Sequence, residues 1–308
     1  MPKLTFKVVT DVNEAKTLWE QFSPHEKIDD EWDFRYTWIE PLDIPLHFIV
    51  GYDGDKAVGM LPLQYNENKG IGQKLFKMDK PFYEIFGGAD TDDNKVMLLP
   101  GYEDHATEFL EQMPRPTILY SLAEPYTVNG VESEHHTDRF EADLTGLTSL
   151  DDYINSFSGK VRKNIKSELK VRFGDAKVEV RDGTREDLHY LWDLSISRFG
   201  EDSSFNMEHR REIFTTLFDR YEIDYFLVLI DDVVRAVSYN LVFNNTYTSI
   251  NMGYDYSVPG LGKFVIRTCL PRAIDKGCTT YDVGKGNNGG YKERLHLKQI
   301  PQYKLVLS

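Results

Sequence analysis

Two glycines separated by one residue form the most suggestive chemical feature of this sequence. Gly260 and Gly262 follow a long strand pattern and open a helical pattern, 262–276. Amides at the start of a helix carry partial positive charge, and glycines let a ligand approach the backbone closely. Together with Lys263, this turn is expected to bind an anion such as a phosphate. The alternative interpretation is a tight strand-to-helix turn without a ligand.

A short basic segment contrasts with the rest of the chain, which carries 50 acidic and 36 basic residues and a net charge of −14. A surface of this sign repels nucleic acids in general, so an anionic ligand needs a local basic patch. Within the segment, Lys160, Arg162 and Lys163 are expected to contact a phosphate or carboxylate of a substrate, with Arg162 able to form two parallel bonds. A solvated helix face is the alternative. The segment's basic residues are Lys160, Arg162, Lys163, Lys166, Lys170 and Arg172.

A carboxylate near the carboxyl end of a late strand, Asp282, has two open roles. It either positions or deprotonates an attacking amine, or it caps the glycine-containing loop that begins at Gly284. No cysteine or serine lies in a setting typical of a nucleophile, so the sequence favours direct attack without a covalent enzyme intermediate. His135 and His136 lack partners at ligand spacing, and no metal site is expected.

The elements that must hold these residues follow a distinctive order in the second half of the chain. Consecutive antiparallel hairpins replace the alternating crossovers of a doubly wound sheet, which excludes that architecture. The turns Asp231-Asp232 and Asn244-Asn245 separate the three hairpin strands. The patterns predict helices over 149–157, 158–174, 184–199, 206–221 and 262–276, and strands over 178–180, 224–231, 233–244, 247–256, 279–284 and 303–308.

The first half repeats this order loosely, which suggests two related domains. A chain of 308 residues suits two domains of about 150 each, and the predicted division is 1–142 and 143–308. The hairpin turn Asp53-Gly54 is a clear signal within it. The predicted fold class is α+β (mixed α/β). The first half is expected to hold strands at 4–9, 47–53, 57–66, 74–78 and 117–124, helices at 11–22 and 103–112, and a loop at 80–94.

The second half resembles the GNAT acyltransferase fold in the order of its elements. GNAT enzymes carry a Gln/Arg-x-x-Gly-x-Gly/Ala signature at the turn described above. Gly260 and Gly262 match its small positions, whereas Ser257 replaces its Gln/Arg. The basic segment and the ending 273–296 resemble FemAB-like and CelD/BioF-type acetyltransferases. The resemblance covers about half of the chain, and it implies tandem GNAT-like domains, each with a mostly antiparallel central sheet flanked by helices.

The resemblance also implies a donor and a place for it. An acyl-CoA such as acetyl-CoA would lie with its pantetheine arm between the strands 247–256 and 279–284. In FemAB-like enzymes an aromatic-Lys pair borders the reaction centre, and Tyr291-Lys292 falls on that pair. Lys292 would then stabilise the oxyanion or the leaving group. The alternative interpretation is that Lys292 is a surface lysine without a catalytic role. The residues implied in donor binding are Ser257, Gly260, Leu261, Gly262 and Lys263.

These observations predict an N-acyltransferase that transfers an acyl group from acyl-CoA to a primary amine of a small polar metabolite or a peptide. One alternative is a FemAB-like peptide ligase that uses aminoacyl-tRNA, which the basic segment favours and the overall acidity disfavours. A second alternative is a GNAT-like protein that binds a ligand without catalysis. Ser257, in place of the signature's Gln/Arg, favours this second alternative.

The remaining composition indicates a cytoplasmic protein. Cys269 and Cys278 show no metal-ligand spacing and no disulfide pattern. The first residues lack the basic and apolar regions of a signal peptide, and no apolar run reaches about 18 residues. Neither a membrane partner nor DNA is expected, and no metal cofactor is implied.

Overall fold

The computed structural model describes residues 3–67, 80–171, 173–286 and 291–308. The chain divides into two compact units. The first unit is Met1–Thr137 together with Pro301–Ser308, and the second is Asp138–Ile300. The units and the predicted domains therefore differ in where they place 138–142 and 301–308. Each unit is a mostly antiparallel sheet with helices against it, and the α+β prediction is confirmed.

In the first unit the strands follow the order β1-β2-β3-β4-β6-β15, with β5 on β3. All of these pairings are antiparallel except the one between β4 and β6. The strands are β1 (Thr5–Val9), β2 (Leu46–Asp53), β3 (Lys56–Asn66), β4 (Phe82–Ile85), β5 (Met97–Leu98), β6 (Thr117–Leu122) and β15 (Lys298–Leu307). A separate hairpin joins β7 (Thr127–Val128) and β8 (Val131–Glu132).

The helices of the first unit are α1 (Val12–Phe22), α2 (Trp32–Thr37) and α4 (Ala106–Glu111), with short 3₁₀ turns η1 (Ile28–Asp30), η2 (Glu40–Leu42), η3 (Gly88–Asp90) and η4 (Glu103–His105). The predicted helix 11–22 is confirmed as α1, and the carboxylate of Asp11 caps it by accepting from the amides of Asn13 and Glu14. The predicted strand 74–78 lies outside the described residues.

One prediction for the first unit is wrong. The segment 80–94 was expected to be a loop, but Phe82–Ile85 forms strand β4. Its side chains are mostly buried, because β3 pairs with one edge and β6 with the other. The strand is short and ends beside Gly87-Gly88, so the pattern of the sequence is dominated by turn residues.

In the second unit the strands follow the order β9-β14-β13-β12-β11-β10. The predicted turns are confirmed: Asp231, Asp232, Asn244 and Asn245 all have positive φ, as two-residue hairpin turns require. These strands are β9 (Glu134–Asp143), β10 (Val178–Asp182), β11 (Glu222–Ile230), β12 (Val233–Phe243), β13 (Thr246–Tyr254) and β14 (Thr280–Gly286).

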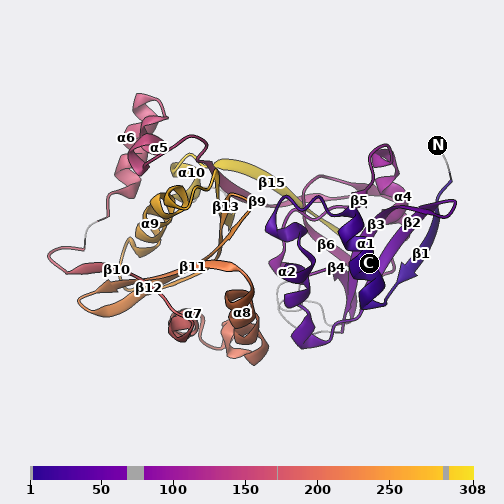
Figure 1. Cartoon of the computed structure of the whole chain (residues 1–308), viewed down its shortest axis with the longest axis horizontal. Coiled ribbons are helices and arrows are strands. Elements are labelled where there is room, and N and C mark those ends of the chain that lie inside the picture. The colour runs from indigo at the N-terminus through magenta and orange to yellow at the C-terminus, as the bar shows by residue number, and fades with distance from the viewer. Residues whose placement is uncertain (1–2, 68–79, 172, 287–290) are drawn as a thin grey trace. The chain divides into compact units, whose positions relative to one another are not determined.

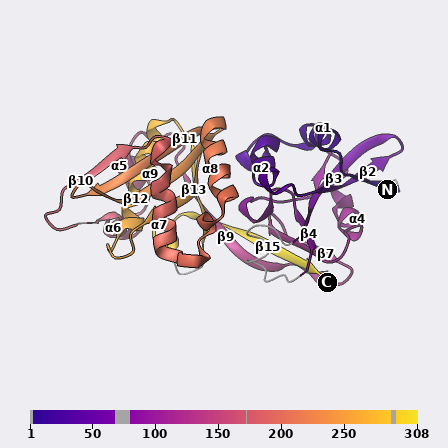
Figure 2. The same ribbon diagram turned by 90° about the horizontal axis from the view of Figure 1, so that it is seen from below.

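Helices cover both faces of this second sheet. In Figure 1, α5, α6 and α9 lie on one side of β10–β12 and α7 and α8 on the other, and Figure 2 shows α7 and α8 from below. The helices are α5 (Leu150–Asn155), α6 (Gly159–Leu169), α7 (His189–Phe199), α8 (Glu208–Arg220), α9 (Leu261–Asp275) and α10 (Tyr291–Arg294), with 3₁₀ turns η5 (Glu186–Leu188), η6 (Gly200–Asp202) and η7 (Ser204–Asn206).

One helix boundary differs from the one expected. Helix α6 ends at Leu169 rather than at Gly174, and the carbonyl of Leu169 accepts from the amide of Val171 and from Arg267. Helix α9 runs through Pro271, in agreement with the predicted helix 262–276, because buried side chains on both sides of the proline hold its face against the core. Ser149 caps α5, since its side chain accepts from the amide of Asp152 at 3.1 Å.

Candidate functional site

The strands β13 and β14 run parallel but stay paired over a short distance only. Their ladder joins Thr246–Thr248 to Thr280–Asp282. Beyond it, β13 remains bonded to β12 as far as Tyr254, and β14 remains bonded to β9 as far as Gly286. In the described part of the chain, no further ladder joins the two strands. The inner edge of β13 therefore offers backbone groups that an extended ligand can pair with.

The turn between β13 and α9 has the conformation that its glycines suggested. Gly260 adopts the left-handed region at φ 89° and ψ −5° and precedes the first helical residue. The first intrahelical bond of α9 runs from the amide of Phe264 to the carbonyl of Gly260 at 3.0 Å. The amides of Leu261, Gly262 and Lys263 precede that bond and belong to the donors that a helix start leaves without an intrahelical partner. The turn thus places amides without an intrahelical partner at the positive end of a helix of 15 residues.

Little room for side chains exists at either glycine. A Cβ atom on Gly262 would lie 3.2 Å from the ring end of Tyr254, and one on Gly260 would lie 3.0 Å from Val171. The two positions therefore need glycine for packing, and Gly260 needs it for conformation as well.

Ser257 is engaged in the turn itself. Its amide and its hydroxyl both donate to one oxygen of Asp255, at 2.9 and 2.6 Å, and the other oxygen accepts from Arg235 at 2.7 Å. The hydrogen bonds from Ser257 are the main reason why the pKa of Asp255 lies below its usual range. At this position, where the GNAT signature has Gln or Arg, Ser257 fixes the backbone that leads into the glycines.

A cluster of charges lies beside the turn. Lys263, in the first turn of α9, donates to one oxygen of Glu168 at 2.7 Å, and Arg294 on α10 pairs with the other oxygen at 3.1 Å. The bond from Lys263 is the main cause that lowers the pKa of Glu168. A cavity of about 470 Å³ adjoins the cluster and is lined by Asn164, Ser167, Glu168, Glu293, Arg294 and His296.

The basic residues predicted to bind substrate separate into two groups. Arg162 is half-buried, and its guanidinium donates to the carbonyls of Asn155 and Phe157, both at 3.1 Å, which caps the end of α5. Lys160 and Lys163 are exposed on α6. Lys160 precedes Asn164 by one helical turn, so it extends the face of α6 that lines the cavity.

Lys292, the lysine predicted near the reaction centre, binds backbone carbonyls at the end of β14. The ammonium of Lys292 donates to the carbonyls of Val283, Gly284 and Lys285 at 2.7, 2.9 and 2.6 Å. Three such bonds match the number of protons on an ammonium group. The geometry fixes the backbone of β14 just beyond its ladder with β13. Tyr291 begins α10, and its side chain lies outside the described part of the structure.

Of the two roles expected of Asp282, the structure shows the contact that caps the glycine loop, and the role toward an amine stays a prediction. One carboxylate oxygen accepts from the amide of Gly284 at 2.8 Å, so it caps the turn at the end of β14. The other lies 3.7 Å from the guanidinium of Arg139, which is buried. The structure therefore brings Asp282, Gly284 and Lys292 together at one strand end, while the glycine turn and Lys263 lie at the start of α9.

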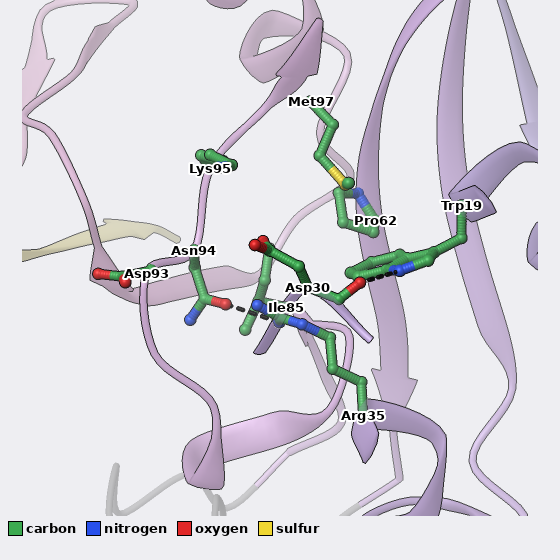
Figure 3. Close-up of a pocket in the computed structure, with 9 residues that line it drawn as sticks. All are labelled: Trp19, Asp30, Arg35, Pro62, Ile85, Asp93, Asn94, Lys95 and Met97. Carbon is green, nitrogen blue, oxygen red and sulfur yellow. Dashed lines mark hydrogen bonds between the residues drawn. The ribbon is translucent and has the colours of Figure 1, made fainter. Parts of the chain in front are cut away.

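The first unit contains a corresponding parallel pair, β4 and β6, and sequence reasoning missed what fills the space beside it. The amide of Asn94 donates to Ser121 and its carbonyl accepts from Ala123, both at 2.9 Å, so Asn94 acts as one further residue of sheet. Buried Arg35 donates to the side chain of Asn94 at 2.7 Å and to the carbonyl of Phe86 at 2.8 Å. Figure 3 shows the side chains of Arg35 and Asn94 meeting. The cavity that these two residues help to line has a volume of only about 10 Å³.

Arg294 and Glu168 were also missed as site residues. They lie far apart in the sequence and meet only because α6 and α10 pack together, so spacing carried no signal for them. Within the described residues, no three or more His, Cys, Asp or Glu side chains gather as metal ligands would. None of the helices in that part of the chain has the length and apolar character needed to cross a membrane.

Comparisons with known proteins agree with this geometry. Residues 159–293 match a family model described as an acetyltransferase (GNAT) domain, a range that runs from α6 to α10. No curated protein matches the chain.

Three solved structures share the fold over almost the whole chain. The crystal structure of FemX has a TM-score of 0.57 at 10% identity, covering 98% of this chain and 97% of that one. A tandem GNAT protein from the clavulanic acid biosynthesis pathway has a TM-score of 0.57 at 8% identity, covering 99% and 98%. A GCN5-related glucosamine N-acetyltransferase region of a fungal multi-domain enzyme has 0.54 at 12% identity, covering 99% and 38%. At these identities the likeness is one of fold.

Proposed function

We propose that the protein is an N-acyltransferase using acyl-CoA, since residues 159–293 match the model of the acetyltransferase (GNAT) domain family. One observation supports this proposal best: the ladder between β13 and β14 is short, and the glycine turn follows the end of β13. The pantetheine arm would pair with the inner edge of β13, and the phosphates would meet the amides of Leu261, Gly262 and Lys263. The acceptor would be a primary amine of a small polar metabolite or a peptide.

The chemistry would proceed by direct attack. The lone pair of a neutral amine attacks the thioester carbonyl, the carbon–sulfur bond breaks, the amine loses a proton, and CoA leaves as a thiol. A covalent route through cysteine is disfavoured. Cys269 and Cys278 are buried, and burial raises the pKa of Cys269 to about 11, which keeps it a thiol at neutral pH.

In this proposal Lys292 and Asp282 position the backbone of β14, and neither transfers the proton that the attacking amine loses. Lys292 holds three carbonyls and Asp282 holds an amide at the strand end that borders the parted region. They would keep the backbone of β14 where a thioester oxygen can reach it. A role for Lys292 in stabilising the oxyanion requires the ammonium to exchange one of these carbonyls for the substrate.

A second candidate donor is an aminoacyl-tRNA. The exposed lysines of α6 favour it, since Lys160, Lys163, Lys166 and Lys170 all face solvent. A tRNA donor predicts binding that weakens steeply with salt, whereas CoA binding through a few phosphate contacts weakens less. The acidic chain as a whole disfavours this candidate.

Calorimetric titration with acetyl-CoA, longer acyl-CoAs and free CoA tests the proposal. The double variant Gly260→Asp, Gly262→Asp places two carboxylates at the turn and should abolish binding. The control variant Gly146→Asp, Gly200→Asp adds the same charge at two positive-φ glycines that have open space around them. Binding that both variants retain would contradict the donor site, and a wild-type protein that binds no CoA species would contradict the proposed donor.

A further inference from the structure

The carboxylate of Glu168 occupies the position that an anionic ligand would take. It lies between two cations that come from different helices, Lys263 at the start of α9 and Arg294 on α10, at 2.7 and 3.1 Å. Ammonium and guanidinium groups converging on one point form the arrangement by which proteins hold phosphate as well as carboxylate. Here the protein supplies the anion itself.

The position of this cluster relates it to the donor turn. Val171, just beyond the end of α6, packs against Gly260, and Glu168 lies in the last turn of α6. Lys263 is the third residue of α9, so its side chain leaves the helix next to the amides of the turn. A phosphate bound to those amides would therefore lie near the ammonium that Glu168 now engages.

The surroundings of Glu168 leave space for a ligand. The cavity of about 470 Å³ lies against Glu168 and Arg294, and its other lining groups are mostly polar. The side chain of Glu168 is 21% exposed, so part of it borders water. Separating a partly exposed ion pair costs little.

We propose that Lys263 and Arg294 are the phosphate ligands of the donor and that Glu168 holds them in place until a phosphate displaces it. This inference rests on the proposed function, since it names the residues that would receive the nucleotide end of an acyl-CoA. The cavity between α6 and α10 receives the phosphate-bearing end, and Glu168 turns away from the two cations. In the protein without a donor, the carboxylate of Glu168 thus holds the two cations side by side.

A purely structural role for Glu168 makes a different prediction. If the carboxylate only ties α6 to α9 and α10, its removal should lower stability and leave donor affinity unchanged or reduced. If the carboxylate competes with phosphate, its removal should raise donor affinity. The two roles therefore predict effects of opposite sign on the same measurement.

The experiment compares Glu168→Gln, Lys263→Gln and Arg294→Gln by calorimetry with CoA, 3′-dephospho-CoA and 4′-phosphopantetheine. We expect Glu168→Gln to bind CoA about fivefold more tightly and each cation variant to bind it about tenfold more weakly. Glu201→Gln and Lys3→Gln change the net charge equally at exposed positions and should bind like the wild type. Loss of the cation effect with 3′-dephospho-CoA would place the 3′-phosphate at the cluster, and its persistence would place the pyrophosphate there.

The possible failures are distinct. A wild-type protein that binds none of the three compounds contradicts the proposed function, and with it this inference. A wild-type protein that binds CoA while Glu168→Gln binds it no better overturns the inference alone. Melting temperatures of all variants show whether any change in affinity follows from partial unfolding instead.

Discussion

Both units contain a parallel pair of strands followed by a glycine with positive φ, but the surroundings of the pair differ. Each has a parallel pair of strands, and in each the first strand of the pair leads into a glycine held at almost the same backbone angles. Gly87 after β4 has φ 93° and ψ −7°, and Gly260 after β13 has φ 89° and ψ −5°. Beyond these glycines the chain forms a 3₁₀ turn of three residues, η3, in the first unit and a helix of 15 residues, α9, in the second.

The contacts of the second strand of each pair, β6 in the first unit and β14 in the second, differ even more. In the first unit Asn94 bonds to the backbone of β6, and the buried guanidinium of Arg35 binds both Asn94 and the carbonyl that precedes Gly87. In the second unit the strands part, and Lys292 holds the end of β14. A polar network of the protein thus fills the space beside β6, whereas the ladder between β13 and β14 is short. This difference is the physical reason why the proposed donor site lies in the second unit.

The largest expected effect comes from breaking the filled network of the first unit. Arg35→Met would remove a buried cation that donates to three carbonyls and two side chains. Leaving these acceptors unpaired should lower the free energy of unfolding by about 3–5 kcal/mol. Urea denaturation measures this loss, and Arg185→Met, at an exposed pair with Asp219, is the control.

CoA affinity of the same variant tests the comparison itself. The folded fraction of Arg35→Met should bind CoA as the wild type does, because the network contributes nothing to a donor site in the second unit. A variant that stays folded but binds CoA much more weakly would mean that the first unit takes part in donor binding.

The next largest effect concerns the strand end in the second unit. Lys292→Met would leave the carbonyls of Val283, Gly284 and Lys285 without their shared donor and should cost about 2–3 kcal/mol. We also expect kcat to fall while the pH dependence of the remaining activity keeps its shape, because the lysine positions backbone rather than transferring a proton. A variant whose pH profile loses or shifts one of its two pKa values would instead assign proton transfer to Lys292.

A buried carboxyl in the first unit gives an effect that depends on pH. Burial, together with the nearby charge of Asp92, raises the pKa of Asp29 to about 7 despite the proximity of Arg35. The folded state therefore holds this proton at pH values where the unfolded state, with a pKa near ~4, has released it. Relative to Asp29→Asn, the wild type should lose stability as pH rises from about 4 to about 7, by about 3 kcal/mol, and change little above. Unfolding curves of both proteins at pH 5 and pH 8 measure the difference, and a stability gap that stays constant would contradict the raised pKa.

Much of the second unit could be predicted because its signals are local. Paired Asp and Asn residues marked both hairpin turns, and the cap of α5 followed from Ser149. The glycine turn was found because only glycine tolerates φ near 89° there. Strand β4 was missed, since four residues beside two glycines carry more turn signal than strand signal.

The charged parts of the site resisted prediction for a different reason. Residue type identified Arg162 as a basic group, but only the packing of α5 against α6 shows that it caps a helix end. Lys292 was predicted to border the reaction centre, whereas its three carbonyl partners follow only from tertiary structure. Glu168, Lys263 and Arg294 meet across three helices, and no spacing in the sequence relates them.

The smallest expected effect compares the two glycines directly. Gly87→Ala and Gly260→Ala each force a residue with a Cβ into the left-handed region, at a cost of about 1–2 kcal/mol. The cost should be higher at Gly87, where the new Cβ would lie 2.6 Å from Thr91, than at Gly260, where it would lie 3.0 Å from Val171. Affinity should show the opposite order: about tenfold weaker CoA binding for Gly260→Ala and none of that loss for Gly87→Ala, because only one turn faces a ligand. Equal losses of affinity in both variants, measured by calorimetry on folded protein, would refute the division of roles between the units.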